Sequence, residues 1–215
     1  PDVTLAPTKQ QYNIYAGLKG KLYHNISYNI RASYISEDSK AMFVTNDFDG
    51  NLANKQPFQY GNSFGLTYDM VNTLNLFGEL NLNFADNVTI GISGEYNSYK
   101  ADLDRVYNLP DAKIGAKIHA DFTKQWFGGL NMYYIGQRND RYLTMNAQST
   151  TPFYEVKGLD SYVDLNAYLG YRPNEHWTTF VKGNNLFNET YKSWNNYKVQ
   201  GFQVLVGAMY KFNFN

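Results

Sequence analysis

The chain has 215 residues and no cysteine, and its 19 Lys and Arg residues balance its 19 Asp and Glu residues. The lack of cysteine excludes disulfides and thiolate metal sites, and a formal charge of zero gives no argument for nucleic acid as a partner. No apolar run is long enough for a transmembrane helix, yet aromatic residues are abundant, with 20 Tyr, 14 Phe and 3 Trp.

Alternation of apolar and other residues predicts a series of long β-strands. After a polar stretch at residues 1–11, strands are expected over residues 12–22, 26–34, 74–84, 88–96, 112–122, 126–134 and 163–171, then from residue 177 and over residues 202–214. The last strand is the clearest, because every second residue from Phe202 to Phe214 is apolar. The faces of the strand that begins at Trp177 are left unassigned. We therefore predict about nine strands joined as up-and-down hairpins.

The connections between these strands alternate in length. Tight turns are expected at residues 23–25, 85–87, 123–125 and 173–176, and long polar loops at about 36–62, 100–111, 139–157 and 188–200. Outer-membrane β-barrels have short periplasmic turns and long external loops, whereas a soluble sandwich has no reason to sort its connections in this way.

The two faces of the expected strands differ in charge. Leu80 and Ile92 belong to faces without Lys, Arg, Asp or Glu, whereas Glu79 and Lys117 belong to the opposite faces. Aromatic residues also stand beside the short turns and recur further along the strands, as in the two girdles of a membrane barrel. The sequence thus predicts an all-β fold, a transmembrane antiparallel up-and-down β-barrel. A soluble β-barrel that binds a lipophilic ligand stays open, because alternation alone also fits a solvated outer face.

Three short segments and the closing strand carry a resemblance to a known family. The segments are residues 15–20 (Tyr-Ala-Gly-Leu-Lys-Gly), residues 43–47 (Phe-Val-Thr-Asn-Asp) and residues 184–191 (Asn-Asn-Leu-Phe-Asn-Glu-Thr-Tyr). With the final strand, they resemble the C-terminal barrel portion of TonB-dependent outer-membrane receptors, above all those of Bacteroidetes. The resemblance implies a barrel of 22 strands, an N-terminal plug in its lumen and a TonB box. Residues 1–215 are then expected to be the C-terminal segment of the barrel domain, with the plug absent from this chain.

The resemblance further implies uptake of a siderophore, a vitamin, a glycan or a peptide at the bacterial outer membrane. Expected partners are outer-membrane lipid, the N-terminal barrel and plug of the same receptor, TonB through that N-terminal part, the barrel-assembly machinery through the C-terminal strand, and a surface lipoprotein. Nucleic acid is not expected as a partner. The alternative is a small self-contained outer-membrane barrel that serves as a passive pore or an adhesin.

The sequence offers no catalytic set, and we expect neither an enzyme nor a bound cofactor. The three histidines lack metal-ligand spacing, and residues 47–51 have the composition of a calcium loop without its spacing, so no metal site is expected. Aromatic and amide side chains in two external loops are the ligand-binding candidates, since they suit a sugar face or an aromatic siderophore. We expect these loops to be exposed at the cell surface. The candidates are Arg138, Asn139, Asp140, Arg141 and Tyr142 in one loop and Tyr191, Trp194, Asn195 and Tyr197 in the other.

Overall fold

The computed structural model describes residues 6–45, 64–102, 105–144, 153–195 and 197–212. In these ranges the regular structure is β-sheet. Among the same residues there is no helix of the length and apolar character needed to cross a membrane.

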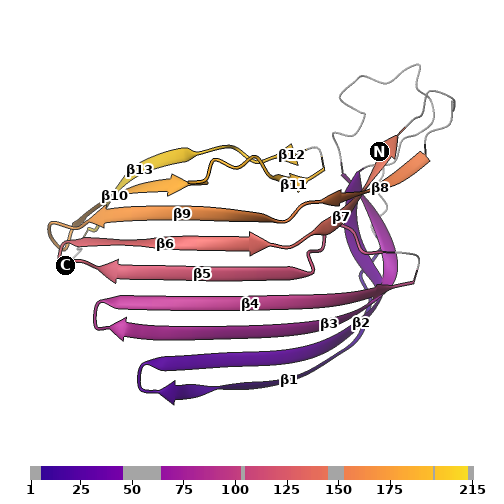
Figure 1. Ribbon diagram of the computed structural model, residues 1–215, viewed down its shortest axis with the longest axis horizontal. Coiled ribbons are helices and arrows are strands. Elements are labelled where there is room, and N and C mark those ends of the chain that lie inside the picture. Colours follow the sequence, from indigo (N-terminus) through magenta and orange to yellow (C-terminus); the bar gives the residue numbers. More distant parts are fainter. Residues whose placement is uncertain (1–5, 46–63, 103–104, 145–152, 196, 213–215) are drawn as a thin grey trace.

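Nine strands form one antiparallel sheet in which each strand pairs with the next, as Figure 1 shows. They are β1 (Gln10–Tyr23), β2 (Ile26–Thr45), β3 (Phe64–Ala85), β4 (Val88–Ala101), β5 (Ala112–Asp121), β6 (Trp126–Ile135), β9 (Tyr162–Tyr171), β10 (Trp177–Asn184) and β13 (Gln203–Tyr210). The predicted up-and-down order of nine strands is confirmed. Two further hairpins, β7 (Arg138–Thr144) with β8 (Phe153–Leu159) and β11 (Lys192–Trp194) with β12 (Tyr197–Lys198), pair only within themselves.

The short turns lie together at one end of the sheet, on the left of Figure 1, and the long connections lie at the other end. We call these the short-turn end and the long-loop end. The chain reverses at the short-turn end between β1 and β2, β3 and β4, β5 and β6, and β9 and β10. This separation is the one that the connection lengths predicted.

Three predicted loops contain more regular structure than expected. Strands β2 and β3 remain paired as far as Thr45 and Phe64, although residues 36–62 were expected to be a loop. A register shift between Glu37 and Lys40 interrupts their ladder, and a bulge of this kind breaks the period-two pattern that marks a strand in sequence. The loops expected at 139–157 and 188–200 contain the β7–β8 and β11–β12 hairpins. The final strand ends at Tyr210 rather than at residue 214, while residues 47–51 and 213–215 lie outside the described residues.

The sheet has one apolar and one polar face. The strand register places apolar residues beside apolar residues, and polar beside polar, on neighbouring strands. One row on the apolar face, paired from strand to strand, comprises Tyr28, Leu80, Ile92, Ala116, Met132 and Leu165. On β10, Val181 joins this face between Leu169 and Val206, which assigns the strand left open above. Many large side chains of this face are exposed, so the sheet presents a broad apolar surface.

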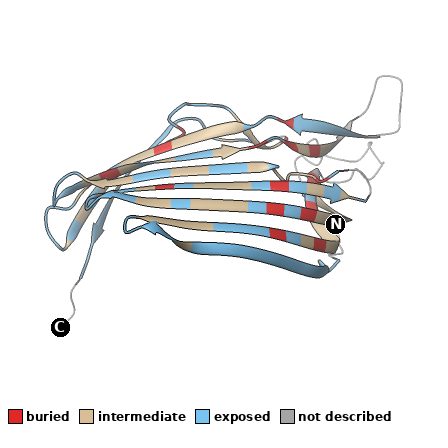
Figure 2. Cartoon of the chain, turned by 60° about the horizontal axis from the view of Figure 1, so that its bottom comes forward, coloured by how far each residue is buried: buried red, intermediate tan, exposed pale blue. Residues whose placement is uncertain are grey.

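The polar face carries several charged side chains at the same level of the sheet. Arg31, Phe77, Glu95 and Lys113 are consecutive register partners, and Lys113 lies 3.7 Å from Glu95. The buried apolar residues instead gather near the long-loop end, where Met42, Val71 and Val106 form a small core; Figure 2 shows buried residues concentrated toward that end.

Candidate functional site

The long-loop end brings together segments that are far apart in the sequence. We call it the loop-end cluster and define it as residues 105–111, strands β7 and β8, residues 185–195, residues 197–198 and the ends of β2 and β3. Strand β7 lies at its centre, because it is hydrogen-bonded both to the 105–111 segment and to the segment that contains Lys192 and Asn195.

Asp140 on β7 is the most deeply buried charged residue of this cluster, with 1% of its surface exposed. Its Oδ1 accepts hydrogen bonds from the side-chain amide of Asn108 at 2.8 Å and from the backbone N–H of Arg141 at 2.8 Å. Its Oδ2 accepts the backbone N–H of Asn195 at 3.0 Å. A buried carboxylate needs such donors, and here they come from β7 itself and from both neighbouring loops.

Asn108 connects this carboxylate to a third region. Its φ of 56° lies in the left-handed region that asparagine tolerates better than most residues. Its backbone N–H donates to the carbonyl of Asn139 at 2.7 Å, and its side-chain amide donates to the carbonyl of Phe43 at 2.9 Å as well as to Asp140. One residue therefore joins β2, β7 and the 105–111 segment.

Arg138 lies two residues before Asp140, on the same side of β7, and is 6% exposed. Its Nη2 donates to the carbonyls of Lys192 and Ser193, and its guanidinium lies 5.3 Å from the ring centre of Tyr162. Burial lowers the pKa of Arg138, while the neighbouring negative groups act in the opposite direction. Both backbone acceptors precede Trp194, so Arg138 fixes the strand that carries this ring.

Two tyrosines continue this arrangement. Tyr162 and Tyr191 stack with ring centres 3.8 Å apart, and the hydroxyl of Tyr191 donates to Asp164 Oδ2 at 3.1 Å. Burial, together with the negative charge of Asp164, raises the pKa of Tyr191 to about 12. Tyr191 is therefore a neutral hydrogen-bond donor at ordinary pH.

Four aromatic rings form the rim of the cluster. Trp194 packs edge-on against Phe43 at 6.0 Å and against Phe64 at 5.0 Å, and Tyr197 stacks on Phe64 at 4.9 Å. Phe43, Phe64 and Tyr197 remain exposed. We call these four residues the aromatic rim. Exposed rings of this kind can stack on a planar or ring-shaped ligand.

Two cavities adjoin the cluster. One of about 370 Å³ lies between residues 157–162 and residues 189–192. The other, of about 500 Å³, lies between the end of β4, residues 105–111 and the base of the β7–β8 hairpin. Both volumes fall in the range of small-ligand sites, and both linings mix charged, hydroxyl and amide groups.

The residues predicted from sequence as two separate sets lie in one cluster. Residues 138–142 all belong to β7, and Asn195 bonds directly to Asp140. Arg138, Asp140 and Asn195 are buried rather than open to solvent, because they hold the loops to one another. That both loops lie at the cell surface stays a prediction. Tyr142 pairs with Glu155 across the hairpin. Sequence reasoning gave no binding role to Phe43, Phe64 or Asn108. Phe43 entered only as part of the family-like segment 43–47, and the signal for Asn108 was the turn-forming character of asparagine before Leu109-Pro110.

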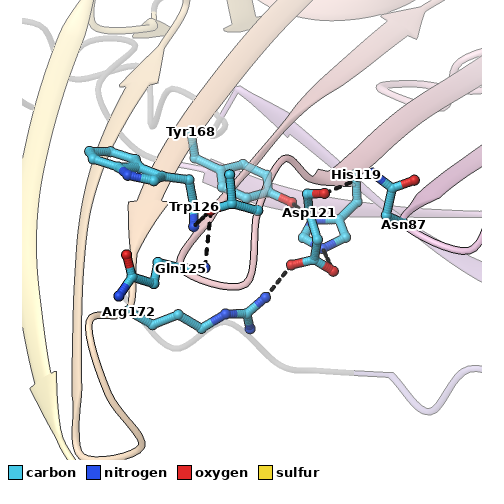
Figure 3. A network of polar contacts seen from close by, with 8 residues as sticks. Asn87, His119, Asp121, Gln125, Trp126, Tyr168 and Arg172 are labelled. Carbon is cyan, nitrogen blue, oxygen red and sulfur yellow. Dashed lines mark hydrogen bonds and ion pairs between the residues drawn. The ribbon is translucent and has the colours of Figure 1, made fainter.

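A second polar network lies on the polar face at the short-turn end (Figure 3). Arg172 bonds to Asp121, His119 Nε2 lies 3.8 Å from Asp121 Oδ2, and His119 Nδ1 lies 2.7 Å from the hydroxyl of Tyr168. These residues tie β5 to β9 across β6 and are all partly exposed. No group of three or more His, Cys, Asp or Glu side chains placed to hold a metal ion is found in the described parts of the chain.

Comparison of the fold with solved structures gives consistent neighbours. The chain is similar to the ferripyoverdine receptor of the outer membrane of Pseudomonas aeruginosa, with a TM-score of 0.66 and 14% identity over 93% of this chain and 27% of that one. The siderophore receptor PirA from Acinetobacter baumannii matches with a TM-score of 0.66 and 15% identity, over 93% of this chain and 31% of that one. The copper transporter OprC matches with a TM-score of 0.67 and 11% identity, over 93% of this chain and 30% of that one.

The sheet shares the barrel fold of these TonB-dependent outer-membrane receptors. At these identities the likeness shows the fold alone. The chain spans less than a third of the length of each of these neighbours. No protein-family model and no curated protein matches the sequence.

Proposed function

We propose that the chain forms part of the barrel wall of a TonB-dependent receptor that takes up a nutrient across the bacterial outer membrane. The observation that carries the proposal is the nine-stranded sheet with a continuous exposed apolar face, a polar opposite face, and short and long connections sorted to its two ends. An apolar face of this extent suits hydrocarbon, and the polar face suits a lumen. The fold shared with siderophore receptors and a copper transporter supports uptake as the activity.

In this proposal the loop-end cluster faces the medium and carries the ligand-binding surface. Its aromatic rim, its amides and its two cavities suit a siderophore, a vitamin, a glycan or a peptide. The motif likeness to receptors of Bacteroidetes supports this range and adds a surface lipoprotein as a partner. Residues 1–215 would then be the C-terminal barrel segment, and TonB would act through an N-terminal part that also supplies the plug.

The edges of the sheet support a need for further strands. Among the described strands, β1 pairs only with β2, and β13 pairs only with β10. An unpaired strand edge in hydrocarbon leaves each amide and carbonyl unsatisfied at a cost of several kcal/mol. Nine alternating strands also leave β1 and β13 running in the same direction, so direct closure would require a parallel pair, which is uncommon in such barrels.

Refolding in detergent micelles tests the proposal. The 215-residue chain alone should aggregate or stay unfolded, and co-expression with the strands that complete the barrel should rescue it. Far-ultraviolet circular dichroism and the mass of the particle report the outcome. A monodisperse, protease-resistant β-rich monomer of this chain alone would replace the proposal with a small self-contained barrel that serves as a pore or an adhesin.

A further inference from the structure

We propose that Asp140 is a positioning residue that locks the aromatic rim in place by joining the three segments that carry or support it. The inference rests on the proposed function in one respect, since the rim matters most if the long-loop end binds a ligand. The lock itself is a property of the described residues.

Asp140 holds both sides of the aromatic rim through one intermediate residue each. Its Oδ2 accepts the backbone N–H of Asn195, which follows Trp194 in the chain. Its Oδ1 accepts the amide of Asn108, and the same amide donates to the backbone carbonyl of Phe43. Phe43 and Trp194 in turn contact each other edge-on at 6.0 Å. The carboxylate therefore closes a ring of contacts that runs from β2 through residues 105–111 and β7 to β11.

A carboxylate is the group that these three donors require. All three hydrogen bonds run toward Asp140, two to Oδ1 and one to Oδ2. An amide in its place would direct an NH₂ group at one of the donors, and with 1% of Asp140 exposed, bulk water does not reach the two groups to separate them. Arg138, two residues earlier, supplies the positive charge near this buried carboxylate.

Hydrogen bonds made by Arg138 and Asn108 hold the same segments that Asp140 joins. Arg138 fixes the carbonyls of Lys192 and Ser193 on the same short strand whose continuation Asp140 fixes at Asn195. Asn108 also donates its backbone N–H to Asn139. Loss of Asp140 should therefore release the contact between Phe43 and Trp194 and leave the nine-stranded sheet intact, because no strand of that sheet pairs through residue 140.

The test follows the ring of Trp194 directly. The chain is co-expressed with the strands that complete the barrel, labelled with 5-fluorotryptophan and purified in detergent micelles, and the ¹⁹F resonance of Trp194 is assigned by its loss in Trp194→Phe. In Asp140→Asn this resonance should shift by more than its line width, and its solvent-isotope shift between H₂O and D₂O should grow at least twofold. Heat-modifiable gel mobility, which reports the assembled barrel, should be unchanged.

The matched control is Asp160→Asn, which neutralises an exposed carboxylate at the turn between β8 and β9 and should leave the Trp194 resonance in place. Asn108→Ala removes the side-chain amide that bonds to Asp140 and to the carbonyl of Phe43, and it should give part of the same shift in the Trp194 resonance. The double variant should give less than the sum of the two single shifts, because both act on one set of contacts.

Two results would overturn the lock: an unshifted Trp194 resonance in Asp140→Asn, or additive shifts in the double variant. Should Asp140→Asn fail to assemble, Asn108→Ala decides, and an unshifted resonance there counts against the lock. These readouts need neither ligand nor transport. Failure of the proposed function would instead appear in the unsubstituted protein, as an absence from the outer membrane or as a lack of uptake.

Discussion

The two ends of the sheet are built on different principles. At the short-turn end each turn joins strands that are adjacent in sequence, and large aromatic side chains such as Tyr23 and Phe84 stand exposed. At the long-loop end polar side chains are buried and bonded across long separations, 32 residues between Asn108 and Asp140 and 55 between Asp140 and Asn195. The first end is determined by local pattern, whereas the second is determined by contacts that no local pattern contains.

The largest effect is expected from a charge on the apolar face between the two ends. Leu80 lies exposed on that face between Tyr28 and Ile92. Leu80→Arg should block membrane assembly, because an Arg near the middle of a bilayer costs about 2–4 kcal/mol at each such site. Glu79→Arg places the same side chain on the polar face and should be tolerated. Heat-modifiable mobility in outer-membrane fractions distinguishes them, and equal assembly of the two variants would contradict a lipid-facing surface.

The next effect concerns close packing on the polar face near the short-turn end. A Cβ on Gly129 would lie 2.2 Å from the carbonyl oxygen of Ile118 and 2.7 Å from the hydroxyl of Tyr168. Gly129→Ala should therefore lower the free energy of unfolding by about 1–3 kcal/mol, the usual cost of overpacking. Gly78→Ala is the control, since its added methyl meets no atom within 4 Å. The midpoint of urea unfolding in lipid bilayers measures both, and equal midpoints would show that the strands around Gly129 adjust freely.

A smaller effect is expected for the ion pair at the short-turn end. Arg172 and Asp121 are bonded, but both side chains are about two-fifths exposed, at 43% and 39%. Exposed pairs contribute about 0–1 kcal/mol, so Arg172→Ala should change the unfolding free energy by less than about 1 kcal/mol. The same urea titration measures it. A loss as large as that of Gly129→Ala would mean that the network in Figure 3 holds this end together, contrary to the contrast drawn above.

The smallest effect is a pH dependence at the long-loop end. The pKa of Tyr191 is raised to about 12 from the ordinary value of 10.0, chiefly by burial and then by Asp164. A raised tyrosine pKa favours the folded state fully below about pH 10, and this contribution is lost as the pH rises from about 10 to 12. Amide hydrogen exchange of residues 188–198 should therefore accelerate more between pH 9 and pH 11 in the parent than in Tyr191→Phe, after correction for the intrinsic rate. An identical pH response in both proteins would remove Tyr191 as the cause.

The difference between the two ends also explains how far the sequence could predict the molecule. Alternation identified the nine strands of the sheet, and connection length placed its two ends, because both features are local. Strand β2 was predicted too short, since the bulge near Glu37 and Lys40 breaks its alternation. Strand β3 was also predicted too short, although Phe64, Leu66 and Tyr68 continue its alternation. Residues 138–142 and 191–197 were recognised by composition as notable. Their burial and their joining through Asp140 depend on Asn108 and Phe43, which are distant from them in sequence and carry no pattern that links them to β7.

Cysteine labelling of intact cells tests the central claim most directly, namely that the two ends of this sheet lie on opposite sides of an outer membrane. The chain has no cysteine of its own, so each substitution introduces a single thiol into it. Asp160→Cys and Lys198→Cys place exposed thiols at the long-loop end, and Asp86→Cys and Glu175→Cys place exposed thiols at the short-turn end. An impermeant maleimide should label the first pair on intact cells and the second pair only after lysis. Labelling of Asp86→Cys or Glu175→Cys on intact cells, with Asp160→Cys and Lys198→Cys protected, would contradict the account.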